Sequence, residues 1–159
     1  MKRKLSSLSI ALFLTSSTLM AQDQECSILT ASDIQTITGT SVVKIPFGSK
    51  IGAGGQCANY AYAEGDQKLY LGVNQIRSVS EYSNTLDHVP QAVYPKREKL
   101  TDLGDEAVLM KDASGSMRYL VARKGNKGVV LFPFRNKKNP SLDPSDEQLK
   151  KLAEIALSR

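Results

Sequence analysis

The sequence predicts an α+β fold in which three helices pack against a sheet that is built from hairpins. Several segments between residues 41 and 134 alternate apolar and polar side chains, which is typical of strands. Turns that contain glycine separate most of these segments. Three other segments, at residues 30–39, 78–89 and 144–157, space their apolar residues as one side of a helix does.

The first 21 residues have the pattern of a secretory signal peptide. Residues 2–4 are basic, residues 5–20 are mainly apolar, and Ala21 is followed by polar residues. The apolar run is short for a membrane span, which needs about 20 residues, and no later segment is a better candidate. We therefore expect cleavage near Ala21 and a soluble exported chain, periplasmic or extracellular, in which residues 22–159 form a single domain.

The formal net charge of +5 overstates the charge of the mature chain, because Lys2, Arg3 and Lys4 leave with the signal peptide. What remains is 18 Lys plus Arg against 16 Asp plus Glu, a net charge of +2. Such a chain has no electrostatic reason to bind nucleic acid.

The chain has two cysteines, Cys26 and Cys57. Because an exported chain meets an oxidising environment, we expect them to form a disulfide. Closing a loop of 31 residues would stabilise the fold by roughly 3 to 4 kcal/mol. A redox or nucleophilic thiol is the alternative, but the sequence has no Cys-x-x-Cys, and His88 is the only histidine that could activate a thiol.

The first helix is expected to begin after Thr30, which is placed to cap it with Asp33 three residues later. Gly39 is expected to end this helix. A strand over residues 41–47 follows, and the glycine-rich residues 48–55 form a hairpin loop. The glycines invite a phosphate-binding interpretation, but the lysine and hydroxyl residue of such loops and the following helix are missing.

Residues 56–63 and 68–77 predict a hairpin of two half-buried strands. Tyr60, Tyr62 and Tyr70 lie on these strands. They are candidates for lining a ligand groove, although aromatic residues on sheets more often pack against their neighbours.

A second helix is expected over residues 78–89, capped by Ser78 with Glu81. His88 lies near its end and has no clustered cysteine or carboxylate partner in the sequence, so we expect no metal site there. The prolines and charged residues of 90–99 indicate an irregular crossing segment.

Three carboxylates, Asp102, Asp105 and Glu106, lie within five positions at the start of a predicted strand. Paired acids can perform general acid/base catalysis or bind a hard cation. A strand would place Asp105 and Glu106 on opposite faces, however, so we expect the three acids to face water beside a tight turn at Gly104.

The C-terminal part predicts strands over 117–124 and 129–134, joined by a turn, and then a final helix. Asp143 before Pro144, or Ser145 with Gln148, would cap this helix. Its buried stripe would consist of Leu149, Leu152, Ala153 and Ala156. Between the last strand and the helix lie Arg135, Lys137 and Lys138, which form either a solvated loop or a contact with an anionic envelope surface or partner.

Taken together, these segments resemble a family of small bacterial cell-envelope proteins of unknown function, many of them lipoproteins. The resemblance rests on three short motifs: Glu25-Cys26-Ser27-Ile28-Leu29-Thr30, Gln56-Cys57-Ala58-Asn59-Tyr60 and Leu103-Gly104-Asp105-Glu106-Ala107. It implies a curved antiparallel sheet of about five to six strands with flanking helices, and a disulfide between the matching cysteines. The lipid-attachment cysteine of many members is missing here, and the family brings no catalytic residues to carry over.

These observations favour a non-enzymatic exported module that binds an unidentified envelope ligand or protein and needs no cofactor. Its candidate surface includes Tyr60, Tyr62, Tyr70, Arg135, Lys137 and Lys138. The first alternative is a periplasmic inhibitor or immunity protein that neutralises a toxin or hydrolase with its loops. The second is a hydrolase that uses the three carboxylates.

Overall fold

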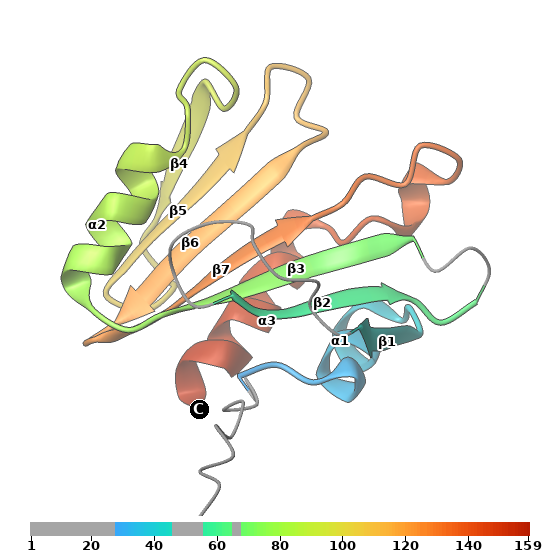
Figure 1. The fold of residues 1–159 in the computed structure, drawn as a ribbon. Helices are drawn as coiled ribbons and strands as arrows, with labels where there is room; N and C mark the ends of the chain where they lie inside the picture. Colours follow the sequence, from blue (N-terminus) through green and yellow to red (C-terminus); the bar gives the residue numbers. More distant parts are fainter. Residues whose placement is uncertain (1–27, 46–55, 65–67) are drawn as a thin grey trace, which may run out of the picture.

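The computed structural model describes residues 28–45, 56–64 and 68–159 (Figure 1). They form an α+β fold with an open, fully antiparallel sheet of seven strands in the order β1-β2-β3-β7-β6-β5-β4. The strands are β1 (Val42–Ile45), β2 (Gln56–Tyr62), β3 (Leu69–Ile76), β4 (Lys96–Leu100), β5 (Glu106–Lys111), β6 (Arg118–Lys124) and β7 (Lys127–Pro133). The helices are α1 (Ala31–Thr38), α2 (Val79–His88) and α3 (Asp146–Ser158), with a short 3₁₀ turn η1 (Pro140–Leu142) before α3.

The sheet has one strand more than the upper end of the range expected from the sequence, and the additional strand is β4. Its residues were expected to form an irregular crossing segment, but they pair antiparallel with β5 from Lys96 opposite Lys111 to Leu100 opposite Ala107. Four of its five residues are exposed, and those four are charged. Charged side chains are typical of edge strands, where they discourage pairing with another chain, and they hide the apolar alternation on which a sequence interpretation depends.

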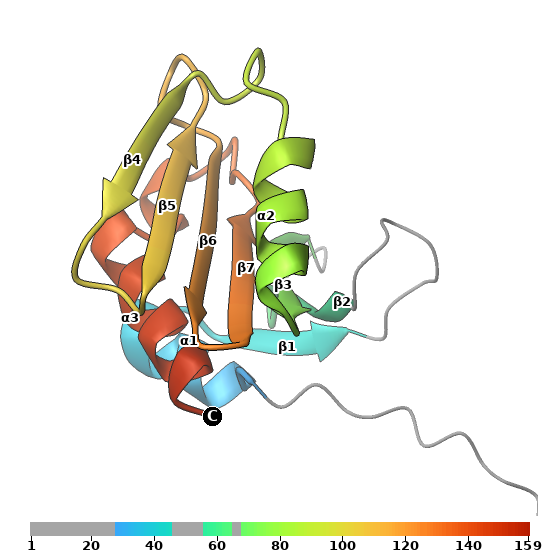
Figure 2. The same cartoon turned by 90° about the vertical axis from the view of Figure 1, so that its left-hand side faces the viewer.

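The three helices lie on both faces of the sheet (Figures 1 and 2). Helices α1 and α3 contact each other on one face, where α3 crosses β6 and β7. Helix α2 lies alone on the other face, against β6 and β3. Only α2 therefore covers that second face among the described elements.

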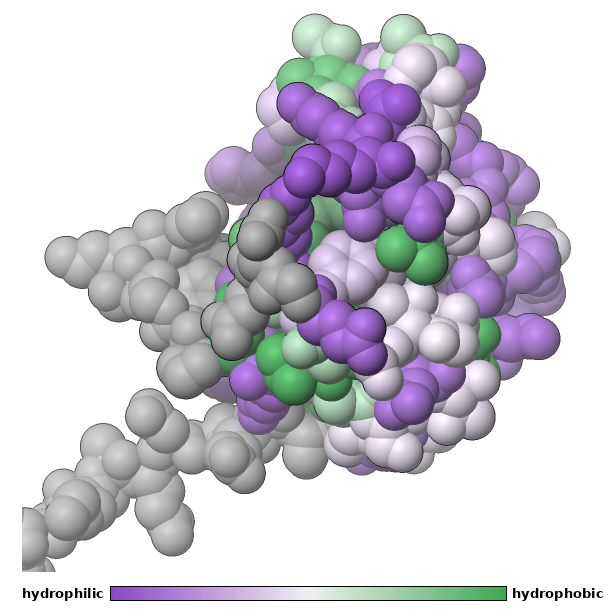
Figure 3. Space-filling model, turned by 90° about the vertical axis from the view of Figure 1, so that its right-hand side faces the viewer, coloured by the Kyte–Doolittle hydropathy of each residue, from purple (hydrophilic) through white to green (hydrophobic). Residues whose placement is uncertain are grey.

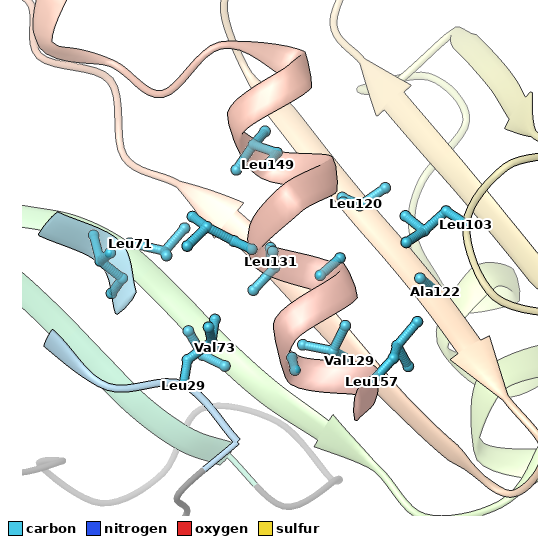
Figure 4. Close-up of a cluster of buried hydrophobic side chains, with 14 of the residues drawn as sticks. Leu29, Leu71, Val73, Leu103, Leu120, Ala122, Val129, Leu131, Leu149 and Leu157 are labelled. Atoms are coloured by element: carbon cyan, nitrogen blue, oxygen red, sulfur yellow. The ribbon is translucent and has the colours of Figure 1, made fainter. Parts of the chain in front are cut away.

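The main core lies between the sheet and the α1/α3 layer (Figure 4). Leu149, Leu152 and Ala153 supply the fully buried side of α3, as the sequence predicts. They meet inward side chains of the central strands, among them Leu71, Val73, Leu120, Val129 and Leu131. Burying a leucine contributes about 1.5 to 3 kcal/mol, so this layer holds the sheet and both helices together.

A smaller core lies under α2. It consists of Ile76, Tyr82, Val89, Met110, Val121 and Val130, with Leu86, Tyr94, Val108, Tyr119 and Phe132 partly buried around it. Arg97 of β4 attaches the end of α2 to the sheet, because its Nη2 donates to the carbonyl of Val89 at 2.6 Å. The second face is therefore well packed beneath α2, and its aromatic side chains lie at the margin of that packing.

The helix starts follow the local sequence. Thr30 and Asp33 form a reciprocal cap at α1, and Gly39 ends this helix in the left-handed conformation with φ of 73°. Ser78 accepts from the amide of Glu81 at α2. Of the two caps that the sequence leaves open for α3, the structure selects Ser145 with Gln148. Among the described residues, no helix is both long and apolar enough to span a membrane.

Asp33 links the start of α1 to the last residue of the chain. Arg159 donates to both of its carboxylate oxygens, at 2.8 and 3.0 Å, and the amide of Thr30 donates at 2.7 Å. Burial acts to raise the pKa of Asp33, but the hydrogen bonds from Arg159 and Thr30 outweigh burial and hold the pKa below its ordinary value of 3.8.

We therefore expect acid to weaken the attachment between α1 and the C-terminus. A carboxyl whose pKa is depressed by folding stabilises the fold fully above its ordinary value and loses this contribution as the pH falls through the lower, folded value. Thermal unfolding between pH 6 and pH 2 should show a smaller acid-induced loss of stability in Asp33→Asn than in the wild type. Asp87→Asn, at an exposed position on α2, is the control. An unchanged acid profile in Asp33→Asn would refute the assignment.

Candidate functional site

Four partly exposed aromatic side chains follow one another across the α2-side face. We call Tyr94, Tyr119, Phe132 and Phe134 the aromatic row. The ring centroids of Tyr94 and Tyr119 are 5.9 Å apart, those of Tyr119 and Phe132 are 6.0 Å apart with planes inclined by 17°, and Phe134 meets Phe132 edge-on at 5.4 Å. The row crosses β6 and β7 and ends just after β7, which gives this face a continuous aromatic strip.

Phe132 is seated on a glycine of the neighbouring strand. Gly72 of β3 pairs with Phe132 of β7, and a Cβ atom at position 72 would lie only 2.0 to 2.6 Å from three atoms of the Phe132 ring. The ring therefore occupies the space that any other residue at position 72 would fill. The absence of a side chain on β3 thus determines where the aromatic row lies.

Both tyrosines of the row are uncharged at neutral pH. Burial raises the pKa of Tyr94 and so does nearby Asp112, while burial, with Tyr94 as a smaller cause, raises the pKa of Tyr119. The hydroxyls therefore remain available as neutral hydrogen-bonding groups beside apolar rings, which is the mixed character of residues enriched in binding surfaces.

At its Tyr94 end, the aromatic row lies near Asp112, in the turn between β5 and β6. Asp112 orders this turn, because its carboxylate accepts from the hydroxyl of Ser114 at 2.7 Å and from the amide of Met117 at 3.0 Å. Two contacts join the turn to its neighbours: Lys96 donates to the carbonyl of Ala113 at 2.7 Å, and Arg135 donates to the hydroxyl of Ser116 at 3.2 Å. The connections at this end of the sheet are therefore linked to one another.

The basic residues Arg135, Lys137 and Lys138 are all exposed on the connection between β7 and α3. Asn136 gives this segment its shape: its amide donates to Asp143 at 2.8 Å, and its side-chain oxygen accepts from the amides of Lys138 and Asn139 at 3.1 and 2.9 Å. The three cations are thus carried by an ordered turn at the same end of the sheet as the turn between β5 and β6.

The expectation that Tyr60, Tyr62 and Tyr70 share a surface is wrong for two of them, since Tyr60 and Tyr70 are fully buried. The Tyr60 hydroxyl donates to the carbonyl of Leu29 at 2.5 Å, and burial, with nearby Asp33, raises its pKa to about 12. Tyr60 and Tyr70 belong to the main core under α1 and α3, and Tyr62 packs against it, so these two helices cover the face that carries the three rings.

Tyr62 is partly exposed and meets Tyr70 edge-on at 5.0 Å. The hydroxyls of both are buried and have no hydrogen-bond partner within the described part of the chain. Burial is the largest cause that raises the pKa of Tyr62. The nearby side chain of Asn136 lowers this pKa in part, without hydrogen-bond geometry to the hydroxyl, and Asp143 raises it further. The structure thus places Tyr62 near the connection that carries Arg135, Lys137 and Lys138, and it leaves Tyr60 and Tyr70 in the core.

The acidic residues are also arranged differently from the expectation. Asp105 and Glu106 do not diverge, because Asp105 precedes β5 and strand alternation does not apply to it. Both approach Arg123, with oxygens 3.7 and 2.6 Å from its guanidinium nitrogens, and Asp105 also accepts from the amide of Gly125 at 2.6 Å. Asp102 is exposed and does not join them at Arg123.

Arg123 in turn lies over the ring of Tyr82 on α2, 5.6 Å from its centroid. Its hydrogen bond with Glu106 raises the pKa of this arginine. The guanidinium of Arg123 thus contacts both carboxylates and the ring of Tyr82, so this cluster joins β5, β6 and α2.

The remaining expectations concern His88 and the two cysteines. His88 is exposed at the end of α2 with its Nδ1 2.6 Å from the carbonyl of Asn84, and no group of three or more potential metal ligands occurs among the described residues. Cys26 and the side chain of Cys57 lie outside the described residues, as does the glycine-rich loop, so the disulfide remains a prediction.

The aromatic row was not identified from the sequence, although part of its signal was present. Phe132 and Phe134 are two residues apart and so share a face, but Tyr94 and Tyr119 come from segments whose proximity depends on the pairing of β4, β5 and β6. No protein-family model, curated protein or solved structure matches this chain.

Proposed function

We propose that this chain is an exported, non-catalytic binding module and that the aromatic row is its binding surface. The observation that carries the proposal is the unequal covering of the sheet. Two helices cover one face, whereas α2 alone covers part of the other and leaves four neighbouring aromatic rings partly exposed. Aromatic side chains contribute large contact areas at low entropic cost, and they are enriched in binding surfaces for that reason.

The arrangement of the carboxylates supports a role without catalysis. Asp105 and Glu106 are held by Arg123, and the remaining acid of the motif, Asp102, does not converge with them. Export, cleavage near Ala21 and the bridge between Cys26 and Cys57 are part of the same proposal, and the N-terminal pattern of the sequence supports them.

The proposal can be tested by site-specific photo-crosslinking. A photoreactive phenylalanine analogue replaces Phe134 at the end of the row, and the matched control carries the same analogue at Lys151, an exposed position on α3. Irradiation in the native envelope fraction should give a discrete adduct from position 134 and none from position 151. Asp105→Asn combined with Glu106→Gln should leave the yield of that adduct unchanged. Equal labelling at both positions, or none at position 134, would contradict the proposal.

A further inference from the structure

The two ends of the sheet differ in charge. We call residues 62–64, 68–69, 90–96, 111–118 and 133–146 the loop end, because the pairing of the strands places all of them at the same end. The described residues of the loop end carry seven Lys plus Arg and four Asp plus Glu. At the opposite end, residues 76–81, 101–106 and 123–127 carry four of each. Among the described residues counted here, the excess of positive charge therefore lies at the loop end.

The four acids leave the described loop end with a net charge of +3, seven cations minus four acids, and none of them forms an ion pair with Lys96, Arg135, Lys137 or Lys138. Asp112 accepts from groups of its own turn, Asp143 accepts from the amide of Asn136, and Asp146 pairs with Lys111 and Arg118. Glu64 is exposed. Five cations of the described loop end are exposed as well: Lys68, Lys96, Arg135, Lys137 and Lys138.

The same end also exposes apolar side chains. Val93, Met117 and Leu142 are 43%, 42% and 39% exposed, and they belong to three different connections. Only two other large apolar residues of the described chain, Val43 and Val79, are exposed to a similar degree. In Figure 3, green hydrophobic side chains lie among purple hydrophilic ones over this side of the molecule.

From this juxtaposition we propose that the loop end docks onto the surface of an anionic phospholipid bilayer. Lys96, Arg135, Lys137 and Lys138 face the headgroups, and Val93, Met117 and Leu142 enter the interface. A bilayer is favoured over an acidic protein because each apolar side chain is on a separate connection. A protein interface needs a contiguous and shape-complementary surface, whereas a lipid interface accommodates separate tips.

The proposal concerns other side chains than the aromatic row and does not depend on what that row binds. Each Lys or Arg near an anionic surface strengthens binding by about fivefold, so removing three cations should weaken it by about 100-fold. Contacts of this kind are screened by salt.

The test is co-sedimentation of the chain comprising residues 22–159 with vesicles of phosphatidylcholine alone or with 30% phosphatidylglycerol. We expect binding to the anionic vesicles only, at accessible lipid concentrations on the order of a millimolar, and release at about 0.5 M salt. The variant Arg135→Gln/Lys137→Gln/Lys138→Gln should lose about 100-fold in affinity. The matched control, Lys99→Gln/Lys124→Gln/Lys127→Gln, removes the same charge from exposed positions away from the loop end and should bind as the wild type does.

A second variant, Met117→Ser/Leu142→Ser, should weaken the binding that survives at intermediate salt. Equal binding to both kinds of vesicle, equal losses in the two charge variants, or no binding to the anionic vesicles would overturn the proposal. Binding to polyglutamate with the same residue dependence, without binding to vesicles, would assign the loop end to an acidic protein and would also overturn it. None of these results changes the cross-linking expected at position 134, so the two proposals fail separately.

Discussion

Gly104→Ala should destabilise the protein by about 3 kcal/mol or more, as measured by urea unfolding. Gly104 has φ of 63°, in the left-handed region, where a side chain costs roughly 1 to 2 kcal/mol. In addition, a Cβ atom at this position would lie 2.3 Å from the carbonyl oxygen of Arg123. That oxygen belongs to the backbone and accepts from the amide of Asp105 at 2.8 Å, so it cannot move without breaking the contact between the two segments.

Gly115→Ala is the matched control. Gly115 also has a positive φ, of 76°, but nothing lies within 4 Å of the Cβ position. This variant should lose only about 1 to 2 kcal/mol, the cost of the backbone conformation. Equal losses in the two variants would show that the contact with Arg123 does not contribute.

Gly72→Ala should have the next largest effect, a loss of about 2 to 3 kcal/mol, because its methyl group and the Phe132 ring would occupy the same space. The effect should depend on the ring. In a double-mutant cycle, Gly72→Ala/Phe132→Ala should be about as stable as Phe132→Ala alone, since the ring is then absent.

A control cycle that pairs Gly72→Ala with Leu149→Ala should be additive, because Leu149 lies on α3 at the opposite face of the sheet. Additive losses of stability from Gly72→Ala and Phe132→Ala would show that the Phe132 ring does not occupy the space beside Gly72. If the aromatic row is the binding surface, Gly72→Ala should also reduce the adduct formed from position 134, because displacing Phe132 disturbs its neighbour Phe134.

The three carboxylates of residues 102–106 show what a local sequence pattern predicts and what it does not. The spacing of Asp102, Asp105 and Glu106 suggested carboxylates that face water, and these residues are indeed exposed. The partner of Asp105 and Glu106, Arg123, is distant in the sequence and is brought to them by the pairing of β5 with β6, which places Glu106 opposite Arg123. A sequence interpretation can identify such acids but cannot identify the cation that contacts both of them.

The sequence alone determined the features that depend on neighbours along the chain. Thr30 with Asp33, Gly39 and Ser78 define helix ends through hydrogen bonds or backbone conformations within a few residues, and the apolar stripe of α3 follows from its own spacing. The hairpins β2–β3 and β6–β7 follow from alternation on either side of a turn. In each case the interacting groups are close in sequence, so the pattern itself contains the information.

Only the tertiary structure decided what depends on residues far apart in the chain. It made a strand of the charged segment Lys96–Leu100, because β5 lies beside it, and it buried Tyr60 and Tyr70. It also assembled the aromatic row from three segments and collected the exposed cations at one end of the sheet. The physical reason is that burial and ion pairing depend on distances in space, and strand order fixes these distances for residues that the sequence separates.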